Sequence, residues 1–165
     1  MITLRPSKAT DLAFVVGLER RPDHADMIGQ WSDLEHLATM QSPKREHWII
    51  ESDGTPVGYL IAFDCRAEDA GFYVKRILVA EKDKGTGTLA LSKFLDRVFF
   101  ELRAKLVWLI VREPNERAQA VYRRLGFKRF DPVGDVARRF HDAGQQPGAG
   151  TFRMLLNARD WEPLR

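Results

Sequence analysis

The sequence has a single cysteine, Cys65, among its 165 residues, which excludes an internal disulfide bond. A lone cysteine is usual in proteins of reducing compartments. The chain also lacks any apolar run near the ~20 residues that a membrane-spanning helix needs, and its N-terminus lacks the apolar core of a signal peptide. We therefore expect a cytoplasmic protein without a membrane partner.

An excess of charge of one sign is also missing. Lysine and arginine number 26 and aspartate and glutamate 23, so the net charge is only +3. A nucleic-acid interface requires a compact basic patch, and pairs such as Arg123-Arg124 and Arg138-Arg139 are more often solvated faces of helices or loops. The four histidines show no spacing typical of metal ligands. The sequence thus predicts no nucleic-acid partner and no bound metal.

What the sequence does have is an alternation of strand and helix patterns, over a length that suits one domain spanning residues 1–165. Apolar and β-branched runs predict strands at residues 2–5, 47–51, 57–63, 72–79, 106–111, 127–130 and 151–156. Periodic apolar positions and capping residues predict helices at residues 10–19, 32–43, 88–103 and 115–125. Residues 20–29 and 131–150 are expected to be irregular. The pattern indicates a mixed α/β fold with antiparallel hairpins and at least one parallel crossover.

The segment at residues 76–88 is the centre of this pattern. A strand ends at Val79, a charged loop with two lysines follows, and Gly85 and Gly87 precede an amphipathic helix. The first N–H groups of a helix have no intrahelical partner, and the helix dipole there favours negative charge. Glycine lets a phosphate approach the backbone and adopts positive φ without strain. We interpret the segment as a cradle for a pyrophosphate.

Other interpretations of this loop exist. One is a plain strand-to-helix turn with solvated lysines. Another is a dinucleotide fingerprint, because Gly85-Thr-Gly87-Thr-Leu-Ala90 fits G-x-G-x-x-A and Glu113 lies downstream, but residues 80–84 separate the first glycine from the strand. A P-loop is excluded because no Gly-Lys-Ser/Thr follows at the required spacing. The remaining interpretation, a coenzyme A site, needs support from elsewhere in the chain.

That support comes from residues 115–127, Asn-Glu-Arg-Ala-Gln-Ala-Val-Tyr-Arg-Arg-Leu-Gly-Phe, in which Asn115 suits a helix N-cap and Gly126 its C′ stop. The segment is similar to the Asn-x-x-Ala-x-x-x-Tyr-x-x-x-Gly-Phe signature of the GCN5-related N-acetyltransferase (GNAT) superfamily. Lys82-Asp-Lys-Gly85-Thr-Gly87 resembles the Arg/Gln-x-x-Gly-x-Gly/Ala loop motif of the same superfamily, with lysine in the first position. The resemblance extends over nearly the whole chain.

The resemblance implies an α/β fold with a central mixed, mostly antiparallel sheet, splayed between its fourth and fifth strands, and with helices on both faces. It implies transfer of an acetyl group from acetyl-CoA, the co-substrate, to a primary amine of a small molecule or a protein within a ternary complex. The CoA contacts that it implies are Ile77, Leu78, Val79, Lys82, Asp83, Lys84, Gly85, Thr86, Gly87, Thr88, Asn115 and Ala118.

Tyr122 is the candidate general acid, because a phenol stays protonated at neutral pH and can donate to a departing thiolate. On spacing alone, a core aromatic beside Val121 and Leu125 is the alternative. Related sequences often carry a glutamate where this chain has Tyr73, so no carboxylate base is expected on that strand. The candidates for the acceptor side are Glu19, His24 and Tyr73.

The sequence leaves open the acceptor amine, a general base and the oligomeric state, a homodimer being one alternative. A non-catalytic acyl-CoA-binding or protein-interaction module with the same fold is the second hypothesis. The tyrosine at position 73, where related sequences often carry a glutamate, favours that module. Tyr122 and the intact glycine loop favour an enzyme.

Overall fold

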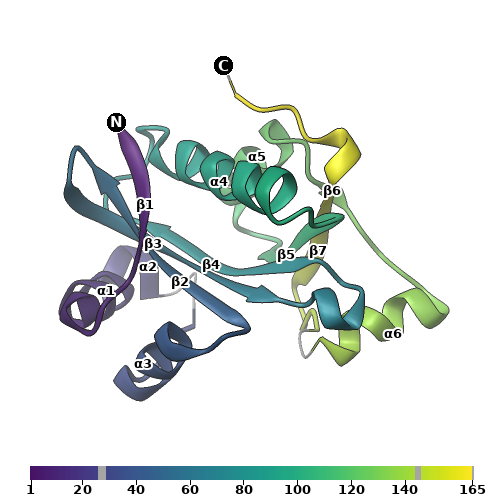
Figure 1. The fold of residues 1–165 in the computed structure, drawn as a ribbon, viewed down its shortest axis with the longest axis horizontal. Helices are drawn as coiled ribbons and strands as arrows, with labels where there is room; N and C mark the ends of the chain where they lie inside the picture. The colour runs from purple at the N-terminus through teal and green to yellow at the C-terminus, as the bar shows by residue number, and fades with distance from the viewer. Residues whose placement is uncertain (26–28, 144–145, 165) are drawn as a thin grey trace. The chain divides into compact units, whose positions relative to one another are not determined.

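The structure is a computed structural model that describes residues 1–25, 29–143 and 146–164. It divides into two compact units, which are described separately. One comprises Met1–Phe63 and Lys75–Lys93, and the other comprises Asp64–Val74 and Phe94–Arg165. Seven strands follow the order β1-β2-β3-β4-β5-β7-β6 in one sheet (Figure 1).

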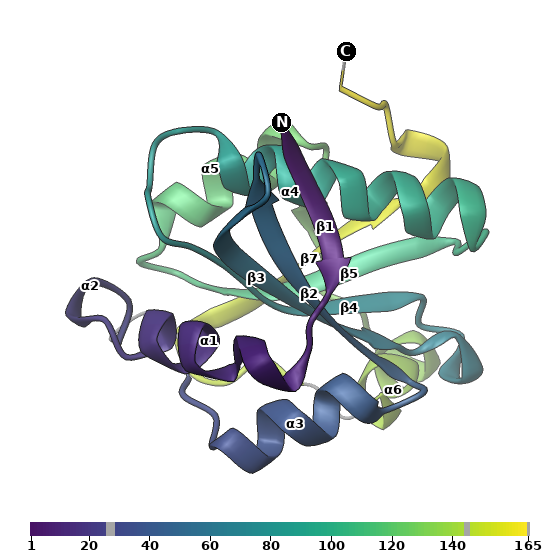
Figure 2. The same cartoon turned by 60° about the vertical axis from the view of Figure 1, so that its left-hand side comes forward.

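The first unit is built from the N-terminal strands and helices. The strands are β1 (Ile2–Pro6), β2 (Arg45–Ser52), β3 (Thr55–Asp64) and the second part of β4 (Phe72–Val79). The helices are α1 (Leu12–Glu19), α2 (Pro22–Ala25), α3 (Asp33–Gln41) and the start of α4 (Thr86–Asp96). The pairs β1–β2 and β2–β3 are antiparallel. Figure 2 shows α1 and α3 side by side beneath these strands.

Helices cover both faces of the strands in this unit. On one face, Ala90 of α4 packs with Ile2 and Ile50, and Ile77 and Val79 of β4 complete that cluster. The other face is covered by α1 and α3 (Figure 2). The expected capping box at the start of α3 is confirmed, because the Ser32 hydroxyl accepts from Glu35 N–H at 3.2 Å.

Two glycines shape the strands of the first unit. Asp53 and Gly54 have φ of 49° and 83°, as a tight type I′ hairpin turn requires, so the predicted β2–β3 hairpin is confirmed. At Gly58, β3 passes so close to β4 that an added Cβ would lie 2.3 Å from the carbonyl oxygen of Leu78. Only glycine therefore fits at this position.

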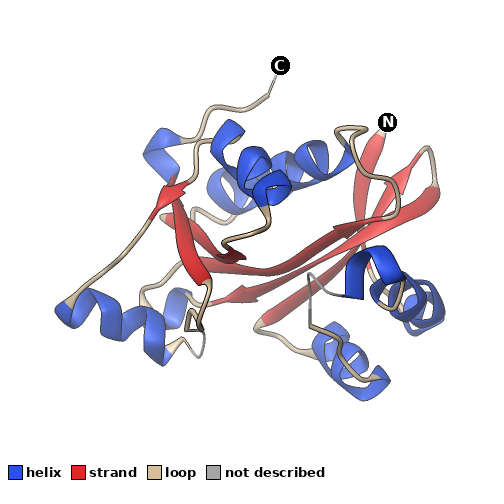
Figure 3. Cartoon of the chain, turned by 180° about the vertical axis from the view of Figure 1, so that it is seen from behind, coloured by secondary structure: helices blue, strands red, loops and turns tan. Residues whose placement is uncertain are grey.

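The second unit is centred on β5 (Leu106–Arg112). Residues Phe72–Val74 of β4 pair parallel with Val107–Leu109, and β7 (Thr151–Asn157) pairs antiparallel on the other edge of β5. The remaining elements are the short β6 (Lys128–Arg129), α5 (Glu116–Arg124), α6 (Gly134–Asp142) and the π-helical turn Arg97–Glu101 that continues α4 (Figure 3). The expected mixed, mostly antiparallel sheet with one parallel pair is thus confirmed. The splay between β4 and β5 stays a prediction, since β4 beyond Val74 belongs to the first unit.

Two segments that were expected to be irregular contain helices. Residues 134–142 form α6 because Phe140 is buried and packs on Trp108 and Phe130, with ring centroids 5.0 Å apart in each case. Val133, Val136, Ala137 and Phe140 do lie at helical spacing, but the glycines and prolines of residues 131–150 indicated a loop, so the helix was missed. Residues 22–25 form the short α2, and residues 26–28 of the other expected loop lie outside the described part of the chain.

Candidate functional site

The start of α4 has the geometry of an anion site. The first α-helical bond runs from Leu89 N–H to the Gly85 carbonyl oxygen at 3.0 Å. Helix geometry therefore leaves the N–H groups of Thr86, Gly87 and Thr88 without an i−4 partner in the helix. These donors and the positive end of the helix dipole favour an anion at this point.

The two glycines of the loop meet different needs. Gly85 has φ of 73°, a conformation that glycine adopts without strain, and an added Cβ there would have no atom within 4 Å. At Gly87 the nearest atom to an added Cβ is Val79 Cγ1, at 4.0 Å. The space beside both glycines is thus open to a ligand, and the loop fits a pyrophosphate.

The cations of the loop have partners within the chain. Lys84 pairs with Glu81, and this hydrogen bond raises the pKa of Lys84 and lowers that of Glu81. Lys82 Nζ donates to the main-chain oxygen of Asp23 at 3.1 Å. Both lysines are exposed, so an anion in the loop can compete for their ammonium groups. Asp83, with φ of 64°, completes the tight turn before the helix.

The last residues of β4 lead into this loop. The side chains of Ile77 and Val79 pack in the cluster around Ala90, and Leu78 is buried. Ala80 N–H donates to Val57 O at 2.7 Å, which fixes the end of β4 against β3. The loop therefore starts from a rigid strand end, as a preorganised binding site requires.

The second unit contains the residues of the second motif. The Asn115 side chain accepts from Ala118 N–H at 3.2 Å, so its expected role as N-cap of α5 is confirmed. Tyr122 is half-buried on α5, and its ring centroid lies 5.9 Å from that of Phe127. Burial raises the pKa of Tyr122 to about 12. Its phenol therefore keeps its proton at neutral pH and can act as a hydrogen-bond donor.

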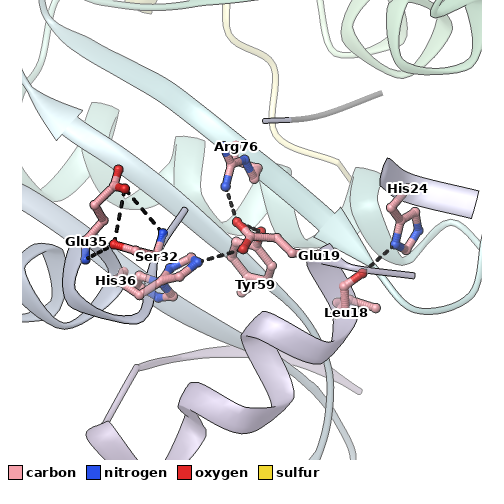
Figure 4. A network of polar contacts seen from close by, with 9 residues as sticks. Leu18, Glu19, His24, Ser32, Glu35, His36, Tyr59 and Arg76 are labelled. Carbon is pink, nitrogen blue, oxygen red and sulfur yellow. Dashed lines mark hydrogen bonds and ion pairs between the residues drawn. The ribbon is translucent and has the colours of Figure 1, made fainter. Parts of the chain in front are cut away.

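Glu19 lies in a buried polar cluster on the α1 and α3 side of the first unit (Figure 4). Its Oε1 accepts from Tyr59 Oη at 3.0 Å and from Arg76 Nη1, and its Oε2 lies 2.9 Å from His36 Nε2. The Glu19 and His36 side chains are 0% exposed and that of Arg76 is 5% exposed. Burial opposes ionisation of Glu19, but the hydrogen bond and charge of His36 and the charge of Arg76 prevail and lower its pKa.

A hydrogen-bonded chain continues from Glu19 through two imidazoles. His36 Nδ1 lies 3.0 Å from His47 Nε2, and His47 Nδ1 lies 2.7 Å from Ser7 Oγ. Because a carboxylate only accepts, His36 Nε2 carries a hydrogen; the direction of the other two bonds depends on whether His36 Nδ1 is also protonated. Burial, followed by the charge of His36, lowers the pKa of His47 to about 4.

The three acceptor-side candidates are all buried. Glu19 uses both carboxylate oxygens within the protein. His24 is 2% exposed, with Nδ1 3.0 Å from the Leu18 carbonyl oxygen and Nε2 without a hydrogen-bond partner in the described part of the chain. Tyr73, in the second unit, is 3% exposed and packs on Trp108 with ring centroids 4.4 Å apart. These positions favour roles in packing and positioning over direct contact with an acceptor.

Sequence reasoning did not identify Arg76, His47 and Tyr59 as members of a cluster. The one local signal was the charged pair Lys75-Arg76 in the middle of an otherwise apolar strand, β4. Nothing in the sequence pairs that arginine with Glu19, because 57 positions separate them. Among residues 1–25, 29–143 and 146–164, no group of three or more histidine, cysteine, aspartate or glutamate side chains is arranged to hold a metal ion. The same residues include no helix long and apolar enough to cross a bilayer.

The chain is similar to a known protein family and to curated acetyltransferases. A family model described as "Acetyltransferase (GNAT) family" matches residues 15–127, which include the glycine loop and the whole of the second motif. Spermidine N(1)-acetyltransferase of Escherichia coli (strain K12) is 25% identical over 166 residues, covering 94% of this chain and 85% of the relative.

Solved structures with a similar fold include two coenzyme A complexes. The spermidine N-acetyltransferase from Vibrio cholerae in complex with CoA and spermine has a TM-score of 0.72 at 17% identity, covering 96% of each chain. The aminoglycoside acetyltransferase AAC(6')-Ib in complex with coenzyme A has a TM-score of 0.75 at 18% identity, covering 97% of this chain and 96% of that one. At these identities the likeness establishes the fold alone.

Proposed function

The chain belongs to the acetyltransferase (GNAT) family, and we propose that it moves the acetyl group of acetyl-CoA to a primary amine by direct attack within a ternary complex. The observation that carries the proposal is the start of α4, where the N–H groups of Thr86, Gly87 and Thr88 precede the first helical bond beside two open glycines. Acetyl-CoA would supply an activated thioester. The protein would bind its phosphates and position the acceptor.

The residues that we assign to CoA follow from the glycine loop and the second motif. Main-chain groups of Ile77, Leu78 and Val79 would bind the pantetheine arm. The pyrophosphate would be bound by the loop and first helical turn, Lys82, Asp83, Lys84, Gly85, Thr86, Gly87 and Thr88. Asn115 and Ala118, which lie on α5 of the second unit, are the further residues that we assign to CoA. The open space beside Gly85 and Gly87 supports this assignment.

Tyr122 is the residue that we assign to proton donation. Departure of a thiolate requires a proton, and a donor must be protonated before the step takes place. Its pKa of about 12 supports this role, since the phenol stays protonated at neutral pH. The attacking amine must be neutral, and no side chain is assigned as its base. A water molecule, or binding of the neutral amine, would meet that need.

The acceptor class is an amine of a small molecule or a protein. Among the curated relatives, the Escherichia coli enzyme is named for spermidine, so polyamines are the first compounds to assay. We assign the acceptor side to residues of the α1–α3 connection that the structure describes, with Glu19 and His24 as positioning groups. Tyr73 has the weaker case of the three candidates because it packs within the second unit. We further propose that the protein works in the cytoplasm, and a homodimer is the assembly to test first.

The experiment is a thiol-release assay with acetyl-CoA and a panel of spermidine, spermine, an aminoglycoside and a lysine peptide. Calorimetry with CoA accompanies it. We expect CoA binding and acetyl-dependent release of thiol with at least one amine. Binding without release for any amine would favour the non-catalytic acyl-CoA-binding module. Absence of CoA binding would contradict the assigned site itself.

A further inference from the structure

The segment that follows α1 is tied to the glycine loop by two hydrogen bonds. Arg21 Nη1 donates to the Ala80 carbonyl oxygen at 2.8 Å, and Lys82 Nζ donates to the Asp23 carbonyl oxygen at 3.1 Å. The two bonds run in opposite directions, one donor coming from each segment. All four residues belong to the first unit. The α2 segment and the loop before α4 are therefore linked twice within one compact body.

The cation on the α2 side is itself held in a fixed geometry. Arg21 Nε and Nη2 contact the two carboxylate oxygens of Asp23 at 3.1 and 2.9 Å, a bidentate arrangement. This fork orients Arg21 so that its remaining nitrogen, Nη1, points to Ala80. The Arg21 side chain is 42% exposed and that of Asp23 is 43% exposed, so the link lies at the surface beside the loop.

The inner side of α2 is held by a different contact. His24 is buried, and its Nδ1–H donates to the Leu18 carbonyl oxygen at 3.0 Å (Figure 4). Its main-chain N–H donates to Arg21 O at 2.9 Å. The four residues of α2 are too few to form a stable helix alone. Its conformation therefore depends on these few contacts, and the loss of one changes how often the helix opens.

Lys82 has two competing partners once a phosphate is present. In the free protein its ammonium binds a neutral carbonyl oxygen of Asp23. That bond already has an ionised donor, but a phosphate oxygen also carries negative charge, so the ammonium is attracted to it more strongly than to the carbonyl oxygen. Lys82 is exposed and can turn toward the loop without disturbing the core. Phosphate binding at the start of α4 would thus remove one of the contacts that hold α2.

We propose that Lys82 couples CoA binding in the glycine loop to the stability of α2, so that bound CoA loosens Pro22–Ala25 while the hydrogen bond from Arg21 to Ala80 stays in place. The inference rests on the proposed function, because α2 is part of the α1–α3 connection assigned to the acceptor. Coupling between two sites is reciprocal. An amine that favours the loosened segment therefore binds better when CoA is bound, and CoA binds better when that amine is bound.

Hydrogen exchange with CoA as the only ligand tests the coupling without an acceptor. In the wild-type protein, saturating CoA is expected to speed exchange at His24 N–H about fivefold, the change expected from one lost hydrogen bond. Lys82→Met is expected to show the fast rate without CoA and no further change with it. Thermal unfolding confirms that each variant folds, which is expected because residue 82 is exposed.

Lys84→Met is the matched control. Lys84 lies in the same loop and carries the same charge, but its partner is Glu81 and not the α2 segment. This variant is expected to lose CoA affinity as Lys82→Met does, and to keep the wild-type exchange response at His24 once CoA is saturating. An equal loss of response in both variants would overturn the coupling, because charge alone would then explain the effect.

The failure of this inference can be told apart from that of the proposed function. Calorimetry reports CoA binding independently of exchange. If CoA binds the wild-type protein and the exchange rate at His24 does not rise, the coupling is overturned and the acetyltransferase assignment stands. If CoA does not bind, the assignment of the glycine loop fails, and the coupling fails with it.

Discussion

Arg76 and Glu19 form an ion pair in which neither side chain is more than 5% exposed. The guanidinium of Arg76, on β4, donates to the carboxylate of Glu19 at the end of α1. Tyr59 and His36 form hydrogen bonds with the same carboxylate. Two charges are thereby removed from water at the point where α1, α3 and three strands meet. The position of α1 against the sheet depends on this pair being complete.

Removing one member of the pair should destabilise the protein strongly. Arg76→Met leaves the Glu19 carboxylate buried without its counter-charge, and we expect a loss of about 3–5 kcal/mol in the free energy of unfolding. Urea denaturation measures it. Lys84→Met, which removes an ion pair whose side chains are each 67% exposed, should leave stability nearly unchanged.

The double variant Glu19→Leu with Arg76→Met removes both charges, and comparison with the single variants measures how strongly the two side chains interact. Its loss of stability should be smaller than the sum of the losses of the two single variants, because neither charge of the pair is left without the other. Strict additivity would show that the two side chains do not interact.

Acid should weaken the fold through His47. The pKa of this imidazole is lowered to about 4 in the folded protein, whereas an unfolded histidine has a pKa of about 6.5. As pH falls below about 6.5 the unfolded state binds the proton first, so stability is complete above that pH and is lost progressively down to about pH 4. The loss from this one group amounts to at most about 3 kcal/mol.

Denaturation midpoints at pH 8, 6.5 and 5 measure this dependence. His47→Gln should flatten the slope between pH 6.5 and 5. His141→Gln, which changes an exposed histidine on α6, should leave the slope as it is in the wild type. An identical slope in the wild-type protein and His47→Gln would contradict the assignment.

Glycine-to-alanine substitutions should have opposite effects at two positions. Gly58→Ala places a Cβ 2.3 Å from the Leu78 carbonyl oxygen, so β3 and β4 must move apart, with an expected loss of about 1–3 kcal/mol. Gly17→Ala places a Cβ in open space on α1 and should stabilise the protein by up to about 1 kcal/mol. Thermal unfolding of both variants measures the difference, and a neutral Gly58→Ala would refute the close approach.

Tyr122→Phe should slow turnover and spare CoA binding. The variant keeps the ring that packs on Phe127 and removes only the proton that we assign to the leaving thiolate. We expect kcat to fall about 100-fold, the scale of one general acid, with a CoA dissociation constant within about twofold of the wild-type value. Steady-state thiol release and calorimetry measure the two quantities. Wild-type turnover in the variant would remove Tyr122 from the mechanism.

Local signals in the sequence predicted much of the fold. The N-caps Ser32 and Asn115 and the turn at Asp53-Gly54 lie where neighbouring residues alone determine the backbone. Gly126, with φ of 103°, ends α5 as its position after Leu125 predicts. These features involve residues a few positions apart, so the sequence carries them directly. The glycine loop was found for the same reason.

The buried cluster and α6 were not accessible to the same reasoning. The contacts of Glu19 with His36, Tyr59 and Arg76 join four elements, and no spacing in the sequence records which strand faces which helix. The α6 helix depends on one buried side chain, Phe140, and the link between Lys82 and Asp23 depends on a main-chain carbonyl that any residue could provide. Tertiary packing decides these features.

The most direct test of the account is CoA binding to Gly87→Val, measured by calorimetry beside the wild type and Gly17→Ala. Valine at the second position of α4 fills the space through which a phosphate reaches the first helical amides. We expect CoA affinity to fall at least tenfold, roughly the loss of one or more charge-assisted hydrogen bonds. Gly17→Ala should bind CoA as the wild type does. Undiminished affinity in a folded Gly87→Val protein would contradict the claim that the start of α4 holds the pyrophosphate.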